Sequence, residues 1–204
     1  MRFELKQLVL LLLLCLTVAA CATRQPIEGR KAGELDRKLS TFAYIEEGKL
    51  VTLIVSVIQA RDRDGSGYMP LQISVSNNGM RQLVLTRESF TLIDENKNRY
   101  PAANPQELIE SYNFLDLDRH MAELPGIIAN KFAAYTQYPS NFSPDQDFSR
   151  LRVVRDLVSL PKFGYMIDFL YFPEPSGGMS GHRFELFLDS PSLEEPVFVK
   201  FEVP

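Results

Sequence analysis

The chain has 204 residues, with 22 basic and 26 acidic side chains and a formal net charge of −4 at pH 7. No stretch is basic enough to bind nucleic acid by releasing counterions, so we expect no nucleic-acid partner. With 45% hydrophobic residues, including 14 Phe and 8 Tyr, the composition predicts a folded protein with a substantial core.

The first 20 residues are typical of a secretory signal. Arg2 and Lys6 precede a run from Leu8 to Ala20 that is apolar or small apart from one threonine. As a helix this run would reach about 20 Å, short of the ~30 Å hydrocarbon core of a bilayer. A basic start, a short apolar middle and small residues at the end predict that 1–20 is a signal peptide outside the fold.

The end of this segment carries a specific motif. Val18, Ala19, Ala20 and Cys21 resemble the lipobox of bacterial lipoproteins. The resemblance implies cleavage between Ala20 and Cys21 and a thioether-linked diacylglyceryl group on Cys21, so that acyl chains such as palmitate hold the protein at a membrane of the cell envelope. Ala22 resembles the residue found in lipoproteins passed to the outer membrane, which implies a periplasm-facing position if the host has two membranes.

The rest of the chain is predicted to be a tether followed by one domain. Residues 21–38 are polar and lack a sustained period, which indicates a lipidated tether, and 39–204 is the expected folded domain. Without the signal, 20 basic and 25 acidic side chains give a charge of −5. Cys21 is then the last cysteine, so the core must depend on packing rather than disulfides.

A two-residue period marks the first strands. The stretch 50–59 places valine or leucine at every second position on one face. In the stretch 71–77 we expect Leu71, Ile73 and Val75 to point inward and Gln72, Ser74 and Ser76 to point outward. Asn77-Asn78-Gly79 predicts a turn before a strand at 81–86, and 89–94 and 99–101 predict a further strand and a short return.

The pattern becomes helical near residue 104. Asn104 as N-cap, Pro105 at the first helical position and Glu107 three residues after the cap predict a helix start. A second helix is expected over 115–124, ended by Pro125-Gly126, and a third over 127–138. Together they predict a helical insertion at about 104–138.

Strands resume after a polar loop. Candidates are 151–159, 165–172, 182–189 and 196–203, and the second of these is apolar on both faces except for Asp168. It is therefore expected to be central or covered by the helices. About eight strands without βα alternation predict a mainly β fold, an antiparallel sandwich. The β portion resembles the immunoglobulin-like domains of bacterial envelope lipoproteins of unassigned function, a likeness of pattern over about two thirds of the chain.

One loop partly matches a calcium site. Asp62, Asp64 and Ser66, followed by Gly67, resemble the first half of an EF-hand loop, but its twelfth position is Ile73 where a bidentate Glu is required. A solvated hairpin loop explains the same residues better.

Two further patterns suggest catalysis or metal binding only weakly. The stretch "GGMSGH" contains Ser180 but has His182 where a nucleophile elbow requires glycine, and it lies between strands. Asp116 and His120 share a helical face, yet the chain has only two histidines and no third ligand is identifiable. The sequence therefore predicts no catalytic residue, no metal and no cofactor.

The remaining candidate site is a stretch rich in aromatic residues. Core packing is the favoured reading of 163–175, and the functional alternative is a recognition patch of Phe163, Tyr165, Tyr171 and Phe172 exposed near the glycine loop.

The first hypothesis for the function of the protein is a non-enzymatic interaction or assembly module, anchored to the membrane through the lipid on Cys21 and bound to another envelope protein. The alternatives are an envelope hydrolase or metal-dependent enzyme and, less favoured, a solute-binding lipoprotein.

Overall fold

The computed structural model describes residues 30–31, 40–144 and 157–204, and this part of the chain is mainly β. The predicted signal peptide, Cys21 and most of the predicted tether lie outside the described residues. Two residues of that tether, Arg30–Lys31, form the short strand β1 and pair with β2.

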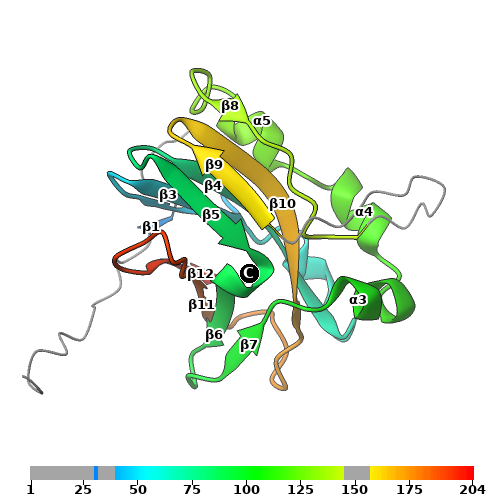
Figure 1. The fold of residues 1–204 in the computed structure, drawn as a ribbon. Helices are drawn as coiled ribbons and strands as arrows, with labels where there is room; N and C mark the ends of the chain where they lie inside the picture. The colour runs from blue at the N-terminus through cyan, green and yellow to red at the C-terminus, as the bar shows by residue number, and fades with distance from the viewer. Residues whose placement is uncertain (1–29, 32–39, 145–156) are drawn as a thin grey trace, which may run out of the picture.

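The largest sheet has six strands in the order β1-β2-β3-β4-β10-β8 (Figure 1). Its other members are β2 (Ala43–Glu47), β3 (Val51–Ser56), β4 (Tyr68–Asn77), β10 (Gly164–Pro173) and β8 (Thr136–Gln137). β4 and β10 pair antiparallel from Gly164↔Asn77 to Pro173↔Tyr68, whereas β8 pairs with β10 in parallel. The prediction that 165–172 is an internal strand is confirmed.

Two smaller antiparallel sheets cover one face of this large sheet. A four-stranded sheet has the order β12-β11-β6-β7, and a two-stranded sheet joins β5 to β9. The strands are β5 (Gln82–Thr86), β6 (Phe90–Asp94), β7 (Arg99–Pro101), β9 (Leu157–Pro161), β11 (Arg183–Leu188) and β12 (Val197–Glu202). Short 3₁₀ turns, η1 (Ala60–Asp62) and η2 (Arg87–Ser89), follow β3 and β5.

The main core lies between these two β layers. It contains the predicted inward residues Leu71, Ile73 and Val75 of β4 together with Leu186 of β11 and Val199 of β12, all with no exposed surface. Alternating apolar residues on strands of both layers therefore meet across one interface, as the two-residue period predicts.

Three short helices connect β7 to β8: α3 (Pro105–Ser111), α4 (Leu115–His120) and α5 (Leu124–Ile128). The start of α3 is confirmed, because the side chain of Asn104 accepts a hydrogen bond from the backbone N–H of Gln106 at 2.9 Å. The prediction of a third helix over 127–138 is wrong. Pro125 and Gly126 lie inside the first turn of α5, where the missing proline N–H costs no hydrogen bond, and residues 136–137 form β8.

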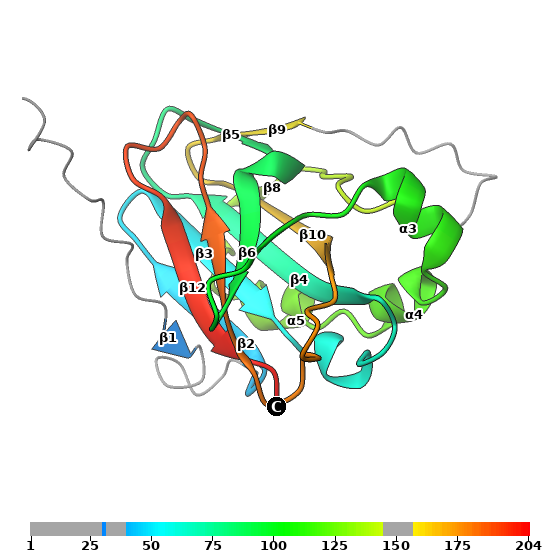
Figure 2. The same ribbon diagram turned by 90° about the horizontal axis from the view of Figure 1, so that it is seen from below.

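The second face of the large sheet is also covered. Figure 2 shows β5 and β9 on one side of β4 and β10, and α5 on the other. A second apolar cluster packs Leu124, Ile128 and Phe132 against residues of β2 and β3. The outward-facing expectation for Gln72, Ser74 and Ser76 is therefore wrong, because these side chains are 1%, 0% and 0% exposed.

Candidate functional site

A polar cavity of about 260 Å³ lies along the edge of β10, past the end of β8. Its walls come from β4, β10, the helical segment and the chain that follows β8. The lining residues are Gln72, Arg119, Ala122, Pro125, Gln137, Ser140, Asn141, Ser143, Ile167, Asp168 and Phe169.

Asp168 supplies the carboxylate of this cavity. Its Oδ2 accepts the backbone N–H of Phe142 and its Oδ1 accepts that of Phe169, each at 2.8 Å. Desolvation raises the pKa of Asp168 above its usual value, although these backbone donors, Ser140 and Arg119 act in the opposite direction. The carboxylate is thus fixed in orientation by a backbone donor on each oxygen.

Gln72 supplies a buried amide. Its Oε1 accepts the backbone N–H groups of Glu123 and Leu124, both at 3.0 Å, and so fixes the start of α5 on the sheet. The residue as a whole is 1% exposed, but its side-chain nitrogen is not among the described side-chain atoms that are buried without a hydrogen-bond partner. Because Gln72 also lines the cavity, this NH₂ group is a donor available to the cavity's contents.

Arg119 balances the charge of Asp168. Its Nη2 donates to Ser143 Oγ at 3.1 Å and to the carbonyl oxygen of Pro144. Ser140 Oγ donates to the carbonyl oxygen of Ile167 at 3.0 Å. Among the described lining residues, Arg119 supplies one guanidinium and Asp168 one carboxylate, and the other polar groups are amides and hydroxyls.

A buried ion pair holds the neighbouring helices in place. Arg63, after η1, lies 2.7 Å from Asp118 of α4, and the Tyr112 hydroxyl donates to the same carboxylate at 2.6 Å. Desolvation raises the pKa of both Asp118 and Tyr112, and the adjacent carboxylate raises that of Tyr112 further. Gln59 reinforces the junction by donating to the Met121 carbonyl at 3.0 Å.

No local sequence pattern indicates this network, because Arg63 and Asp118 are 55 residues apart. Gln72 and Arg119 were likewise missed, since one was expected to face solvent and the other lies on a charged helix. The alternation in β4 was the available signal: a polar stripe on a strand next to a predicted helical insertion marks the face that the insertion can cover.

The four residues of the predicted aromatic patch do not lie together on one exposed surface. Tyr171 and Phe172 are 1% and 0% exposed, so their predicted exposure is wrong. Phe172 packs in the main core, while Tyr171 contacts the Tyr112 ring beneath the helices at a centroid distance of 5.3 Å. Phe163 is 48% exposed and Tyr165 is half-buried, but both lie at the start of β10, the opposite end from the glycine loop.

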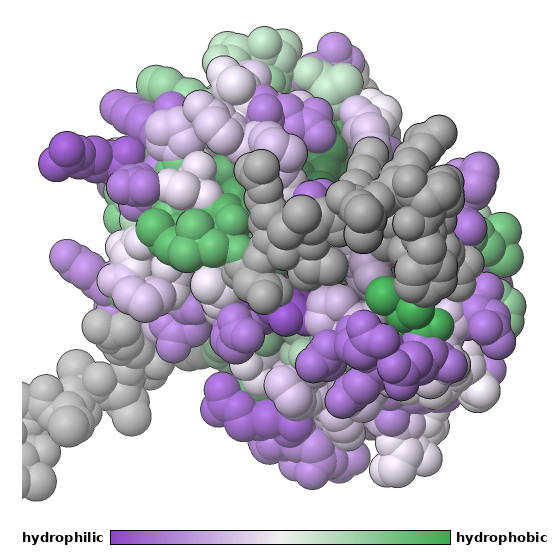
Figure 3. Space-filling model, turned by 45° about the vertical axis from the view of Figure 1, so that its right-hand side comes forward, coloured by the Kyte–Doolittle hydropathy of each residue, from purple (hydrophilic) through white to green (hydrophobic). Residues whose placement is uncertain are grey.

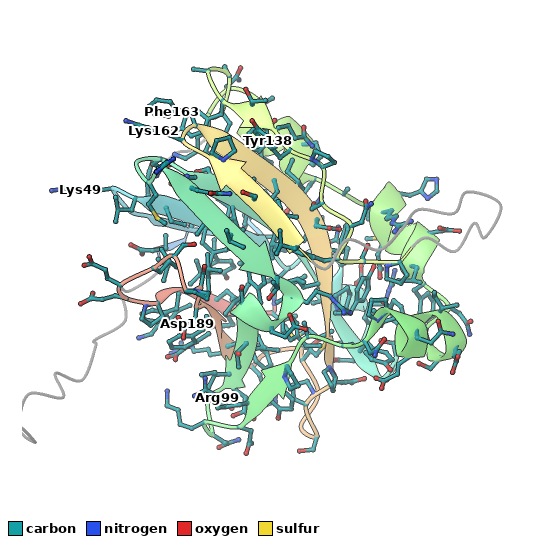
Figure 4. All side chains as sticks on the ribbon, viewed as in Figure 1. Lys49, Arg99, Tyr138, Lys162, Phe163 and Asp189 are labelled. Atoms are coloured by element: carbon teal, nitrogen blue, oxygen red, sulfur yellow. The ribbon has the colours of Figure 1, made fainter. Side chains whose placement is uncertain are left out.

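Phe163 belongs to a group that we call the tip cluster: Leu50, Tyr135, Tyr138, Lys162 and Phe163. Figure 4 shows Lys162, Phe163 and Tyr138 together at the start of β10. The Phe163 ring contacts Tyr135 edge-on at 5.4 Å and lies 4.9 Å from Lys162 Nζ. Leu50 is 52% exposed on the turn before β3.

The turn between β4 and β5 joins the two parts of the tip cluster. The backbone N–H of Asn78 donates to the Leu50 carbonyl at 2.8 Å, and that of Phe163 donates to the Asn77 carbonyl at 2.7 Å. Gly164 is required beside Phe163, because a Cβ there would lie 2.9 Å from the Pro161 carbonyl oxygen. On the face in Figure 3, hydrophobic residues form separate areas among hydrophilic ones.

Phe163 has a backbone φ of 61°. This left-handed conformation is uncommon for a bulky side chain and costs of order 1–2 kcal/mol. The fold therefore holds an aromatic ring, half in solvent, at a position where glycine would be less strained.

Hydrogen bonds join the calcium-like loop, which contains Asp64, to the glycine loop at 177–182. Asp64 accepts the backbone N–H of Met179 at 2.8 Å, and Glu174 accepts those of Gly65 and Gly67 at 2.7 and 2.8 Å. Burial alone would raise the pKa of Asp64, but the hydrogen bonds from Ser180 and Met179 outweigh burial and lower it. Asp62 pairs instead with Arg61 at 2.9 Å, and Ser66 bonds to the Tyr68 carbonyl.

The remaining two motifs, Ser180 with His182 and Asp116 with His120, also have hydrogen-bond partners of their own. His182 Nδ1 lies 2.9 Å from Glu95, while Asp64 accepts the backbone N–H of Ser180. His120 is exposed, and its Nδ1 lies 2.6 Å from the carbonyl oxygen of Asp116. Within 30–31, 40–144 and 157–204, no group of three His, Cys, Asp or Glu side chains could hold a metal ion.

Fold and cavity together define a mainly β protein of two packed β layers with a helical cover and a polar recess. No protein-family model matches the chain, and no curated protein matches it in sequence. Among solved structures it is similar to a protein of Bacillus subtilis subsp. subtilis str. 168, described as "putative lipoprotein (ycdA)", with a TM-score of 0.41 and 13% identity. The match covers 78% of this chain but 38% of that one. No helix in the described part of this chain is long and apolar enough to span a bilayer.

Proposed function

We propose that this chain is a lipid-anchored protein of the bacterial cell envelope that acts as a non-enzymatic interaction or assembly module. In this proposal Cys21 carries the lipid, and the tip cluster contacts another envelope protein. The two β layers, antiparallel apart from the β8–β10 pair, are taken as an immunoglobulin-like sandwich with a helical insertion, facing the periplasm from the outer membrane if the host has two membranes.

The observation that carries the proposal is the strained, half-exposed Phe163. Backbone strain at an exposed aromatic residue persists where the ring's position is useful, and aromatic side chains contribute most to protein interfaces. Three exposed cations lie near the tip cluster: Lys49 on the turn before β3, Arg81 on the turn before β5 and Lys162 on the turn before β10. None of them forms an ion pair within the described residues. The expected partner surface is therefore an apolar pocket with carboxylates at its rim.

The contact surface can be tested by crosslinking in the intact envelope. A photoreactive phenylalanine analogue at position 163 should give a discrete crosslinked species that contains a second envelope protein. The matched control is position 157, because Leu157 is 56% exposed at the end of β9 remote from Pro161. Equal crosslinking from both positions, or none from position 163, would exclude the tip cluster as the contact surface.

The anchor is tested separately. Cys21→Ser should leave the protein unprocessed or released from membranes, whereas Cys15→Ser, in the predicted signal peptide, should change neither processing nor retention. Normal processing and membrane retention of Cys21→Ser would refute the anchor.

A further inference from the structure

The chain enters the large sheet from the end that carries the tip cluster. β1 pairs antiparallel with β2, so that Arg30 lies opposite Ile45 and Lys31 opposite Tyr44. Because β2 runs toward the turn at 48–50, β1 begins at the same end of the sheet and runs away from that turn. The tip cluster and the point where the predicted tether joins the fold thus share one end.

The part of the tether that precedes β1 is short. Nine residue steps separate Cys21 from Arg30, and a fully extended chain of this length spans about 30 Å. A flexible chain spans less on average, about 15–20 Å. The opposite end of the sheet lies about 30 Å further away along the ten residues of β4. A lipid on Cys21 therefore holds the tip end nearer to the bilayer than the opposite end.

We infer that the tip cluster faces the bilayer that holds the lipid of Cys21 and binds the exposed surface of a protein embedded in that bilayer. Both the lipid and the contact belong to the proposed function, on which this inference rests. What is new is the class of the partner.

The length of the tether selects an embedded partner over a soluble one. A soluble domain of about 100 residues has a radius of gyration of about 13 Å, and its diameter as a sphere exceeds about 30 Å. Such a domain cannot lie between the tip cluster and the bilayer unless the tether is fully extended. A protein embedded in the bilayer presents its surface at the headgroups and needs no such gap.

The tip cluster also selects a protein over the lipid surface. The exposed cations Lys49, Arg81 and Lys162, near Leu50 and Phe163, would suit anionic headgroups as well as carboxylates. A fluid bilayer, however, accepts an aromatic ring in many orientations and gives no reason to hold one at a strained φ of 61°. An apolar pocket of fixed shape requires one position of the ring, and carboxylates at its rim would pair with the cations.

Energy transfer to the bilayer measures which end of the sheet faces the membrane. A fluorophore is attached to Gln82→Cys or, as the matched control, to Ser176→Cys in the purified lipidated protein, since both positions are exposed. Gln82 begins β5 at the tip end, and Ser176 lies beyond the end of β10 at the opposite end. In phosphatidylcholine vesicles with acceptor-labelled headgroups, transfer should be greater from position 82. Equal transfer, or greater transfer from position 176, would overturn the inference.

The composition of the same vesicles distinguishes an embedded protein from the lipid as the occupant. Addition of phosphatidylglycerol should leave the transfer from position 82 unchanged, because the net charge of the protein is negative and no partner is present. A rise in transfer that Lys162→Ala abolishes would identify the anionic bilayer as the occupant and would overturn the inference.

A longer tether tests the class of the partner in the intact envelope. About 20 Gly and Ser residues inserted between Cys21 and Arg30 should lower crosslinking from position 163 about sixfold, because the effective concentration of two sites on one membrane falls with the −3/2 power of linker length. Unchanged crosslinking would show a partner that is not confined to the bilayer, which overturns the inference and leaves the proposed function intact. If the chain with its natural tether gives no crosslink, the proposed function fails instead, so the two failures are distinguishable.

Discussion

The two faces of β4 are equally buried and chemically opposite. Leu71, Ile73 and Val75 meet the second β layer, whereas Gln72, Ser74 and Ser76 lie beneath the helical segment. The apolar face needs no hydrogen bonds and gains stability from area removed from water. On the polar face, each buried polar group needs its own hydrogen-bond partner. Gln72 on this face also lines the cavity.

This difference shows what alternation along a strand establishes. A two-residue period assigns residues to two faces, but it does not say whether the polar face meets solvent or another element. Substitutions on each face test whether the two faces stabilise the fold in these different ways.

The largest effect is expected at the ion pair that holds the helices over the polar face. Asp118→Ala leaves Arg63, which is 6% exposed, without its counter-charge and should lower the free energy of unfolding by about 3–5 kcal/mol. Urea denaturation measures this loss. Removing both charges in Arg63→Met/Asp118→Leu should cost less than Asp118→Ala alone, and a larger loss in the double variant would contradict this reading.

A slightly smaller loss is expected on the apolar face. Ile73→Ala removes a side chain with no exposed surface from the main core and should cost about 2–5 kcal/mol, the range for large-to-small substitutions that leave a cavity. The same denaturation experiment checks it. A cost below about 1 kcal/mol would show that the two β layers are not packed against each other as described.

The pH dependence of stability distinguishes the carboxylates near the polar face. Because desolvation raises the pKa of Asp168 in the folded protein, the folded state keeps its proton at pH values where the unfolded chain has lost it. The free energy of unfolding should therefore fall as the pH rises from the ordinary carboxyl pKa through the raised one, by about 1.4 kcal/mol for each unit between the two.

Asp168→Asn should reduce this slope without abolishing it, because Asp118 also has a raised pKa and contributes with the same sign. Denaturation at a series of pH values measures the difference, with Asp189→Asn, at an exposed carboxylate that follows β11, as control. A steeper slope in Asp168→Asn would contradict the assignment.

The smallest effect is expected next to Ile73. Ser74 has no exposed surface, and its hydroxyl has no hydrogen-bond partner among the described residues. Ser74→Ala removes an unsatisfied polar group while keeping the packing, so stability should stay within about 0.5 kcal/mol or rise. A loss above about 1 kcal/mol would indicate that the hydroxyl is satisfied in solution.

The sequence predicted much of the fold because its signals are local. The N-cap at Asn104, the turn at Asn77-Asn78-Gly79 and the alternating strands all depend on neighbouring residues. Pro125-Gly126 misled the prediction, because the same dipeptide can end one helix or lie in the first turn of the next.

The cavity and the tip cluster depend on distant residues and could not be predicted in the same way. Gln72 acquires its role only when α5 packs over β4, and the partner of Arg63 lies 55 residues away. The strain at Phe163 follows from the turn that joins two different sheets. A backbone φ of 61° at a phenylalanine has no signature in the sequence.

In the proposed function, the Phe163 ring serves contact with a partner rather than stability. The most direct test combines two measurements on Phe163→Gly: its free energy of unfolding, and crosslinking to the partner from a photoreactive residue at position 50. The free energy of unfolding should stay within about 1 kcal/mol of the native value, since relief of backbone strain offsets the lost ring contacts, and the crosslinked species should disappear. A large loss of stability with crosslinking intact would show that the ring serves the fold and not the partner.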